Sequence, residues 1–131
     1  MAQIIVSANV VVPNGPSFAF SQTLEVEAYD RIDVSVPAAP ATTNKKVELL
    51  GGTGEVQFIA ITSDWFGDDL TYKINSNAAA TVARKLNQPH LFVGTGAVSL
   101  FDAAPKTLFF SNAAPGQDAN VQILIGRDAT P

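Results

Sequence analysis

The chain has 131 residues and no cysteine, and its 12 acidic and 8 basic residues give it a net charge of −4. This length predicts one domain, spanning residues 1–131, that buries its own core, and the lack of cysteine excludes disulfides, thiol nucleophiles and cysteine-ligated metals. The basic residues are scattered rather than clustered on one stretch, which argues against nucleic acid as a partner.

The first third of the chain predicts strands joined by tight connections. Gln3–Val12 is rich in Ile and Val and ends at the turn signal Pro13–Pro16. It lacks the basic start and cleavage site of a signal peptide, and the sequence has no run of about 20 apolar residues that would cross a membrane. Phe18–Tyr29 and Arg31–Val36 alternate apolar and polar residues, so we expect two half-buried strands with a bend at Tyr29–Asp30.

The middle of the chain predicts further strands separated by loops of small residues. Pro37–Asn44 contains two prolines and is expected to connect one sheet with another. Lys46–Leu50 predicts a short strand. Glu55–Thr62 has apolar residues at both odd and even positions and therefore predicts a central strand covered on both faces. After a loop at 63–69, Leu70–Asn75 alternates again.

One segment indicates a helix. Asn77 can cap Ala78–Leu86, and Arg84 and Lys85 would then lie at the negative end of the helix dipole. Pro89 prevents extension beyond this point. We therefore expect one short helix near 77–87, although an extended conformation of Thr81–Leu86 is the alternative.

The last third predicts strands at four places: Leu91–Val93, Ala97–Phe101, Lys106–Ser111 and Asn120–Gly126. Leu49–Val56 and Leu91–Val98 share the pattern L-x-x-G-T-G-x-V, which predicts the same hairpin twice. About ten short strands with Gly/Pro turns indicate an all-β fold, an antiparallel β-sandwich or jelly-roll-like domain. Phe109 and Phe110 must face opposite ways on their strand, so one of them needs cover outside the main core.

The residues that most often carry catalysis are sparse. His90 is the single histidine, no G-x-S-x-G motif marks a nucleophile, and Glu25, Glu27 and Asp33 lie on the wet faces of predicted strands. We therefore predict no catalytic residue and no cofactor, and His90 is expected to be a turn or strand-end residue.

The loop Ser63–Asp69 holds the most suggestive cluster. Asp64, Asp68 and Asp69 supply carboxylates that suit Ca²⁺, although their spacing is not that of an EF-hand. Trp65 and Phe66 are candidates for an interface with another protein, and Trp65 also suits sugar stacking. A plain structural loop that folds back onto the end of the sandwich is the third reading, and the sequence leaves all three open.

Charged residues make up 15% of the chain, against roughly 25% in ordinary soluble domains. Two readings fit this low charge. The surface is either neutral and polar, or partly buried against other subunits, where Lys and Glu are depleted.

Lys106–Asp128 forms a strand, a polar loop and a strand that ends in I-L-I-G-R-D. Together with the apolar, charge-poor start, this ending resembles small β-sandwich proteins of tailed bacteriophages, including capsid decoration (cement) proteins. The resemblance implies a virion protein that forms a homo-oligomer, with a trimer favoured, and that binds a capsid protein by burying surface. It also implies that Met1–Val12 or the last strand pairs with neighbours, and it carries over no site residues. The alternative function is a carbohydrate-binding or lectin-like module that uses Trp65 and the 63–69 loop.

Overall fold

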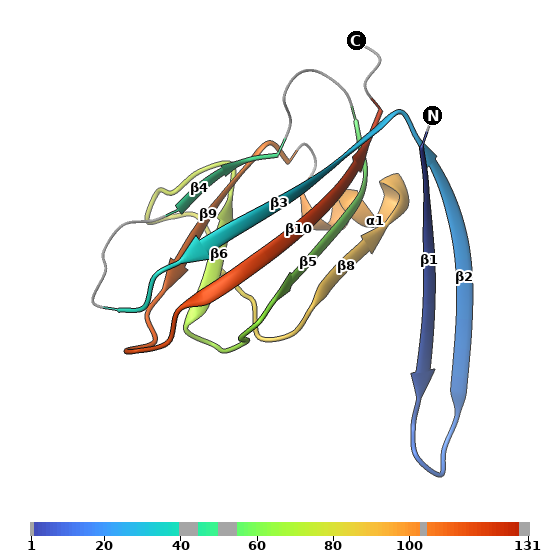
Figure 1. Cartoon of the computed structure of the whole chain (residues 1–131), viewed down its shortest axis with the longest axis horizontal. Helices are drawn as coiled ribbons and strands as arrows, with labels where there is room; N and C mark the ends of the chain where they lie inside the picture. Colours follow the sequence, from blue (N-terminus) through green and yellow to red (C-terminus); the bar gives the residue numbers. More distant parts are fainter. Residues whose placement is uncertain (1, 40–44, 50–54, 103–104, 129–131) are drawn as a thin grey trace.

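The computed structural model describes residues 2–39, 45–49, 55–102 and 105–128, and Figure 1 shows a β-sandwich from which a long hairpin projects. Sheet I has the strand order β3-β10-β5-β8 and sheet II the order β4-β9-β6-β7, with every neighbouring pair antiparallel. The all-β sandwich class is thus confirmed. The strands of sheet I are β3 (Ala28–Val36), β10 (Ala119–Arg127), β5 (Val56–Ser63) and β8 (His90–Val93). The strands of sheet II are β4 (Lys45–Glu48), β9 (Thr107–Asn112), β6 (Leu70–Ile74) and β7 (Arg84–Lys85).

The main core lies between the two sheets. Side chains alternate along each strand, so β10 sends Val121, Ile123 and Ile125 inward, where each is almost completely buried. They pack with residues of sheet II such as Leu108 and Phe110. The chain passes from sheet I to sheet II between β3 and β4, as predicted for the connection at 37–44, although residues 40–44 lie outside the described part.

Strand β5 is covered on both faces, as its apolar pattern predicts. Ile59 and Ile61 belong to the main core, while Phe58 points to the other side of sheet I and packs with Ile4 and Val26. These two residues come from the projecting hairpin, which is formed by β1 (Ala2–Val11) and β2 (Ser17–Val26). The cover on the outer face of β5 is therefore the base of that hairpin.

The helix near 77–87 is a wrong prediction, because the one helix described, α1, spans Gly94–Phe101. In the predicted helical segment, residues 79–80 form a turn and Arg84–Lys85 form β7, which pairs with β6. The amide of Leu86 donates to the Leu70 carbonyl at 2.8 Å, and the Leu86 side chain is fully buried. Pairing with β6 and burial of Leu86 thus outweigh the helix propensity of the alanines.

The strand predicted at Ala97–Phe101 is also wrong, because these residues belong to the helix α1. Gly94 has a φ of 87° and begins the helix, and Val98 and Phe101, three residues apart, point into the main core. The hairpin predicted for the second L-x-x-G-T-G-x-V is therefore not formed. In the first copy the Gly-rich residues 51–54 lie outside the described residues.

Phe109 and Phe110 do face opposite sides of β9. Phe110 is fully buried in the main core, and Phe109 is half-buried on the outer face of sheet II. Phe109 lies between its cross-strand partners Lys46 on β4 and Lys73 on β6. Long lysine stems can cover an aromatic ring while the ammonium groups stay in water.

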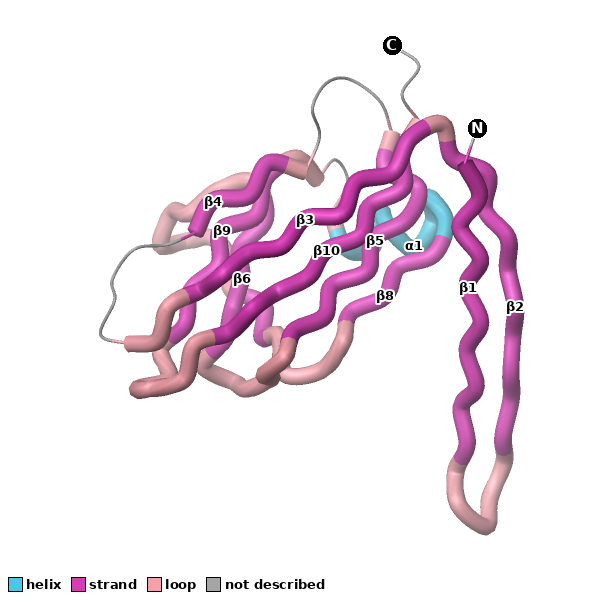
Figure 2. The backbone as a smooth tube through the Cα atoms, in the orientation of Figure 1, coloured by secondary structure: helices cyan, strands magenta, loops and turns pink. Residues whose placement is uncertain are grey.

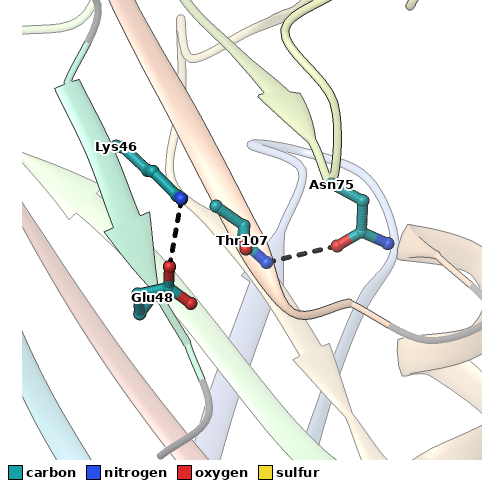
Figure 3. Close-up of polar contacts among 4 residues, drawn as sticks. All are labelled: Lys46, Glu48, Asn75 and Thr107. Atoms are coloured by element: carbon teal, nitrogen blue, oxygen red, sulfur yellow. Dashed lines mark hydrogen bonds and ion pairs between the residues drawn. The ribbon is translucent and has the colours of Figure 1, made fainter.

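Asn75 links the ends of three elements at one corner of the sandwich. Its φ of 65° is a left-handed conformation that asparagine tolerates better than most residues. Its side-chain oxygen accepts from the amides of Lys106 and Thr107, at 2.8 and 3.2 Å, and its amide nitrogen donates to Asp102 after α1. Figure 3 shows the bond to Thr107, and beside it the ion pair between Lys46 and Glu48 on β4. That pair is largely exposed and contributes little stability.

None of the helices in the described part of the chain is long and apolar enough to span a membrane.

The base of the hairpin fits tightly over Gly126 of β10. A Cβ atom added at Gly126 would lie 2.6 Å from Cδ1 of Ile4 and 3.0 Å from Cγ1 of Val26. Both distances are shorter than an ordinary carbon–carbon contact of about 3.5–4.0 Å. The absence of a side chain at residue 126 therefore allows the hairpin to pack closely on sheet I.

We expect Gly126→Ala to lower the free energy of unfolding by about 1–3 kcal/mol, because it overpacks this contact. Ile4→Val removes Cδ1, the atom nearest to the new methyl group. Urea unfolding of the two single variants and the double variant should show that Gly126→Ala costs less in the Ile4→Val background. Equal costs in both backgrounds would show that the contact between Gly126 and Ile4 is not tight.

Candidate functional site

The hairpin of residues 2–26, called the arm here, extends well beyond the sandwich, as Figures 1 and 2 show. Its two strands have 10 residues each and pair along their whole length, from Ala2 opposite Val26 to Val11 opposite Ser17. The turn predicted at Pro13–Pro16 is confirmed, with Asn14 at a φ of 60° and the Gly15 amide bonded to the Val12 carbonyl at 2.8 Å. Within the described residues, neither strand pairs with a third.

The arm has one apolar face, called the stripe here. Because side chains alternate along a strand and even-numbered residues pair with even-numbered ones, the even residues of both strands share this face. Gln22 is its one polar member. The stripe consists of Ala2, Ile4, Val6, Ala8, Val10, Phe18, Phe20, Gln22, Leu24 and Val26. The odd-numbered face is mostly polar and carries Ser7, Asn9, Ser17, Ser21 and Thr23.

The half of the stripe near the sandwich is buried by the protein itself. Ile4, Val6 and Val26 form a second core with Phe58. Ala60, Val93 and Leu124 of sheet I pack around this core, so the outer faces of β5, β8 and β10 all contribute. The base of the arm is therefore held by ordinary apolar burial.

The half of the stripe near the turn is exposed. Phe18 is 63% exposed, Phe20 38% and Val10 45%, although they lie on the same face as the buried residues. A two-stranded hairpin is marginally stable by itself in water, and exposed apolar patches on soluble proteins often mark interaction sites. The tip of the arm is thus the strongest candidate for a functional surface.

The arm carries one charged side chain, Glu25, which lies at its base on the odd-numbered face. All 12 acidic and all 8 basic residues of the chain lie at or beyond Glu25. Exposed strands in monomeric proteins usually carry lysines or other charges that prevent association through their edges and faces. The sequence left open whether Phe18 and Phe20 belong to a core or to an interface, and it did not single out Val10. A signal was present in the charge-free stretch from residue 1 to residue 24.

The last strand is not available for pairing with a neighbour. Strand β10 lies between β3 and β5 and is bonded to both, so its two edges are already used. Of the two segments that the phage resemblance suggested for strand addition, β10 is therefore excluded. The outer edge of β1 remains open, since β1 pairs with β2 alone among the described residues.

Trp65 and Phe66, the interface candidates from the sequence, are both half-buried and pack against the main core. The Trp65 ring lies so close to Gly67 that a Cβ there would be 2.7 Å from its Cζ2 and Cη2 atoms. The Trp65 amide donates to Ser63 at 3.3 Å. Trp65 and Phe66 thus fold back onto the end of the sandwich. This arrangement agrees with the plain structural loop, one of the three interpretations that the sequence left open.

The three carboxylates of this loop are not brought together. Asp64 accepts from the backbone and side-chain amides of Asn120, both at 2.9 Å, and these bonds lower the pKa of its carboxyl. Asp68 instead accepts a hydrogen bond from the side-chain amide of Asn87 at 3.0 Å and forms an ion pair with Lys85 at 3.8 Å. Among the side chains that the structure describes, no three His, Cys, Asp or Glu residues gather as metal ligands, and Asp69 joins no such group.

His90 lies at the start of β8 and contacts the opposite sheet. Its Nδ1 lies 2.6 Å from the hydroxyl of Tyr72 on β6, and the two rings meet edge to face. Burial raises the pKa of the Tyr72 phenol, so the hydroxyl keeps its proton beside the His90 ring. Tyr72 and the nearby Phe101 are completely buried, and Arg84 lies over the Phe101 ring at 5.5 Å. The strand-end histidine predicted from the sequence therefore joins the two sheets.

We expect the protein to lose stability as the pH falls below about 6.5, the ordinary histidine value. Desolvation lowers the pKa of His90, and the charge of Arg84 lowers it further, whereas a backbone hydrogen bond with Lys85 raises it. The unfolded chain therefore takes up a proton on His90 at a higher pH than the folded chain does. The contribution of the neutral histidine to the free energy of unfolding is complete above pH 6.5 and is lost as the pH falls from 6.5 through the lower pKa of the folded state. Urea unfolding between pH 8 and 5 measures the effect.

His90→Gln is the control for this pH dependence, because the chain has no other histidine. The variant should show a flat free energy of unfolding through the window in which the parent protein declines. If both proteins decline equally as the pH falls from 6.5, groups other than His90 control the stability there.

Comparison with protein-family models, with curated proteins and with solved structures gives no match. The function therefore has to be inferred from the arm, the loop and the core themselves.

Proposed function

We propose that this protein is a non-catalytic structural subunit of a larger assembly and that it works by burying the apolar tip of its arm. The observation that carries the proposal is the stripe, which is buried at its base by sheet I and exposed at Phe18, Phe20 and Val10. An apolar face that continues beyond the cover provided by its own chain gains stability when another surface covers it, and such faces often mark interaction sites.

The assembly that fits best is the virion of a tailed bacteriophage, where the protein would be a homo-oligomer bound to a capsid protein. The support is the resemblance of the chain to small β-sandwich decoration proteins, together with the 15% charge content and the absence of charged residues before Glu25. Low charge suits a surface that is buried against other subunits. The resemblance favours a trimer, and it gives neither a catalytic nor a cofactor role to any residue.

The test is cosedimentation with purified capsids, prepared without the protein, of the phage that encodes it. The proposal predicts saturable binding at a fixed ratio of this protein to capsid subunits. Binding that does not saturate, or no binding at concentrations well above those in an infected cell, would contradict it.

The carbohydrate-binding alternative receives no support from Trp65, whose ring packs against Gly67 and the main core. A sugar-stacking platform needs an open aromatic face.

A further inference from the structure

We infer that the exposed half of the stripe is covered by the arm of another copy of this chain, so that arms pack with their apolar faces together. This inference rests on the proposed assembly function and names the partner of the arm. Three features of the arm support it: the continuity of the stripe, its lack of charge and the sizes of its side chains.

The continuity of the stripe shows what kind of surface covers it. At its base, the stripe packs on the outer face of a β-sheet, through Phe58, Ala60 and Val93. The exposed half has the same geometry and the same chemistry, so its natural cover is again an apolar β-sheet face, packed about 10 Å away. The stripe of a second copy is such a face.

The lack of charge favours a second copy over an unrelated protein. The chain has a net charge of −4, so two copies repel each other wherever their acidic surfaces meet. The arm avoids this repulsion, because residues 1–24 contain no Asp, Glu, Lys or Arg and the turn end of the arm projects away from the sandwich (Figure 1). The same absence leaves no charged group by which the arm could select a charged partner.

The side-chain sizes at the tip suit packing of the stripe against itself. Ala8 lies opposite Phe20 across the hairpin, and Val10 lies opposite Phe18, so each large ring has a smaller neighbour beside it. When two such faces meet around a symmetry axis, the rings of one copy can occupy the hollows beside the small residues of the other. A contact around a two-fold axis requires this kind of self-complementary surface.

Single-cysteine cross-linking tests the inference directly, since the natural chain has no cysteine. Ala8→Cys and Val10→Cys place a thiol on the stripe. Asn9→Cys and Val11→Cys are matched controls, because they lie next in sequence on the same strand but on the opposite face. All four leave Phe18 and Phe20 unchanged.

Under mild oxidation at low protein concentration, or with a short bifunctional maleimide, positions 8 and 10 should form covalent dimers at least about tenfold faster than positions 9 and 11. A rate that alternates with the face of the strand is the expected result, because alternate residues point to opposite sides. Equal rates at all four positions, or no covalent dimer at positions 8 and 10, would overturn the inference.

The two proposals fail in different ways. If the protein binds capsids saturably while positions 8 and 10 do not cross-link, the assembly function stands and packing between arms is wrong. If positions 8 and 10 cross-link while capsids bind no protein, the arms pack together and the proposed function is wrong.

Discussion

Phe101→Ala is expected to lower the free energy of unfolding by about 3–5 kcal/mol, the usual cost of removing a fully buried Phe side chain. The Phe101 ring is completely buried where α1 ends, and its centroid lies 5.1 Å from that of Phe92 and 5.9 Å from that of Tyr72. Its loss would leave a cavity and remove one of the two contacts, with that of Val98, by which α1 packs into the main core. Urea unfolding followed by the fluorescence of Trp65, the single tryptophan, measures the change.

Leu100→Ala is the matched control, since Leu100 is the preceding residue of α1 and is 78% exposed. Its substitution should change the free energy of unfolding by no more than about 0.5 kcal/mol. Both variants must be compared with the parent at one protein concentration, because association would stabilise the folded state. A loss below about 1 kcal/mol for Phe101→Ala would show that α1 is not packed as described.

Phe18→Glu is expected to weaken self-association by at least about 100-fold. Burial of a Phe ring contributes about 1.5–3 kcal/mol, and Phe18 is 63% exposed before association. In a symmetric contact the substitution occurs in every copy, so the losses of two copies add to about 2–4 kcal/mol, around the roughly 2.7 kcal/mol that corresponds to 100-fold. The introduced carboxylate would also be buried without a partner. Sedimentation velocity over a concentration series measures the change.

Ala19→Glu is the control for this experiment. It adds the same charge at the next residue of β2, on the odd-numbered face, which stays exposed to solvent when the stripes pack together. Association of this variant should stay close to that of the parent protein. If both glutamates weaken association equally, the general charge of the arm, rather than its stripe, determines the effect.

Much of the sandwich could be predicted, because most strands alternate and their ends carry turn residues. The arm strands, their turn and the strands at β3, β5, β6, β9 and β10 all lie close to the predicted ranges. The bend between β2 and β3 lies at Glu27 rather than at Tyr29–Asp30. Alternation continues across a bend, so the pattern gave no local signal for its place.

The helix could not be placed from the sequence, because local preference and tertiary contacts disagree in two segments. The alanines before Thr81 favour a helix, but Arg84 and Lys85 extend sheet II. Gly94 and Gly96 disfavour a helix, yet they begin one whose Val98 and Phe101 fill the core. These outcomes depend on partners far away in sequence.

The candidate site was predicted only in part. The sequence drew attention to Trp65 and Phe66, aromatic residues in a loop, but both pack against the main core. The sequence could not show that the apolar face of the first hairpin continues beyond the sandwich. The alternation within the hairpin shows which residues share a face, but not how many of them sheet I covers. Phe18 and Phe20 therefore looked equally suitable for a core and for an interface.

The most direct test of the central claim, that this is an assembly protein whose arm needs a second copy, is its mass in solution. Size-exclusion chromatography with light scattering should be run over a wide range of protein concentrations. We expect an oligomer whose mass is a whole multiple of 13.8 kDa, a dimer or a trimer, that dissociates only on dilution. A 13.8 kDa monomer at every concentration would contradict it and leave the stripe without the partner inferred here.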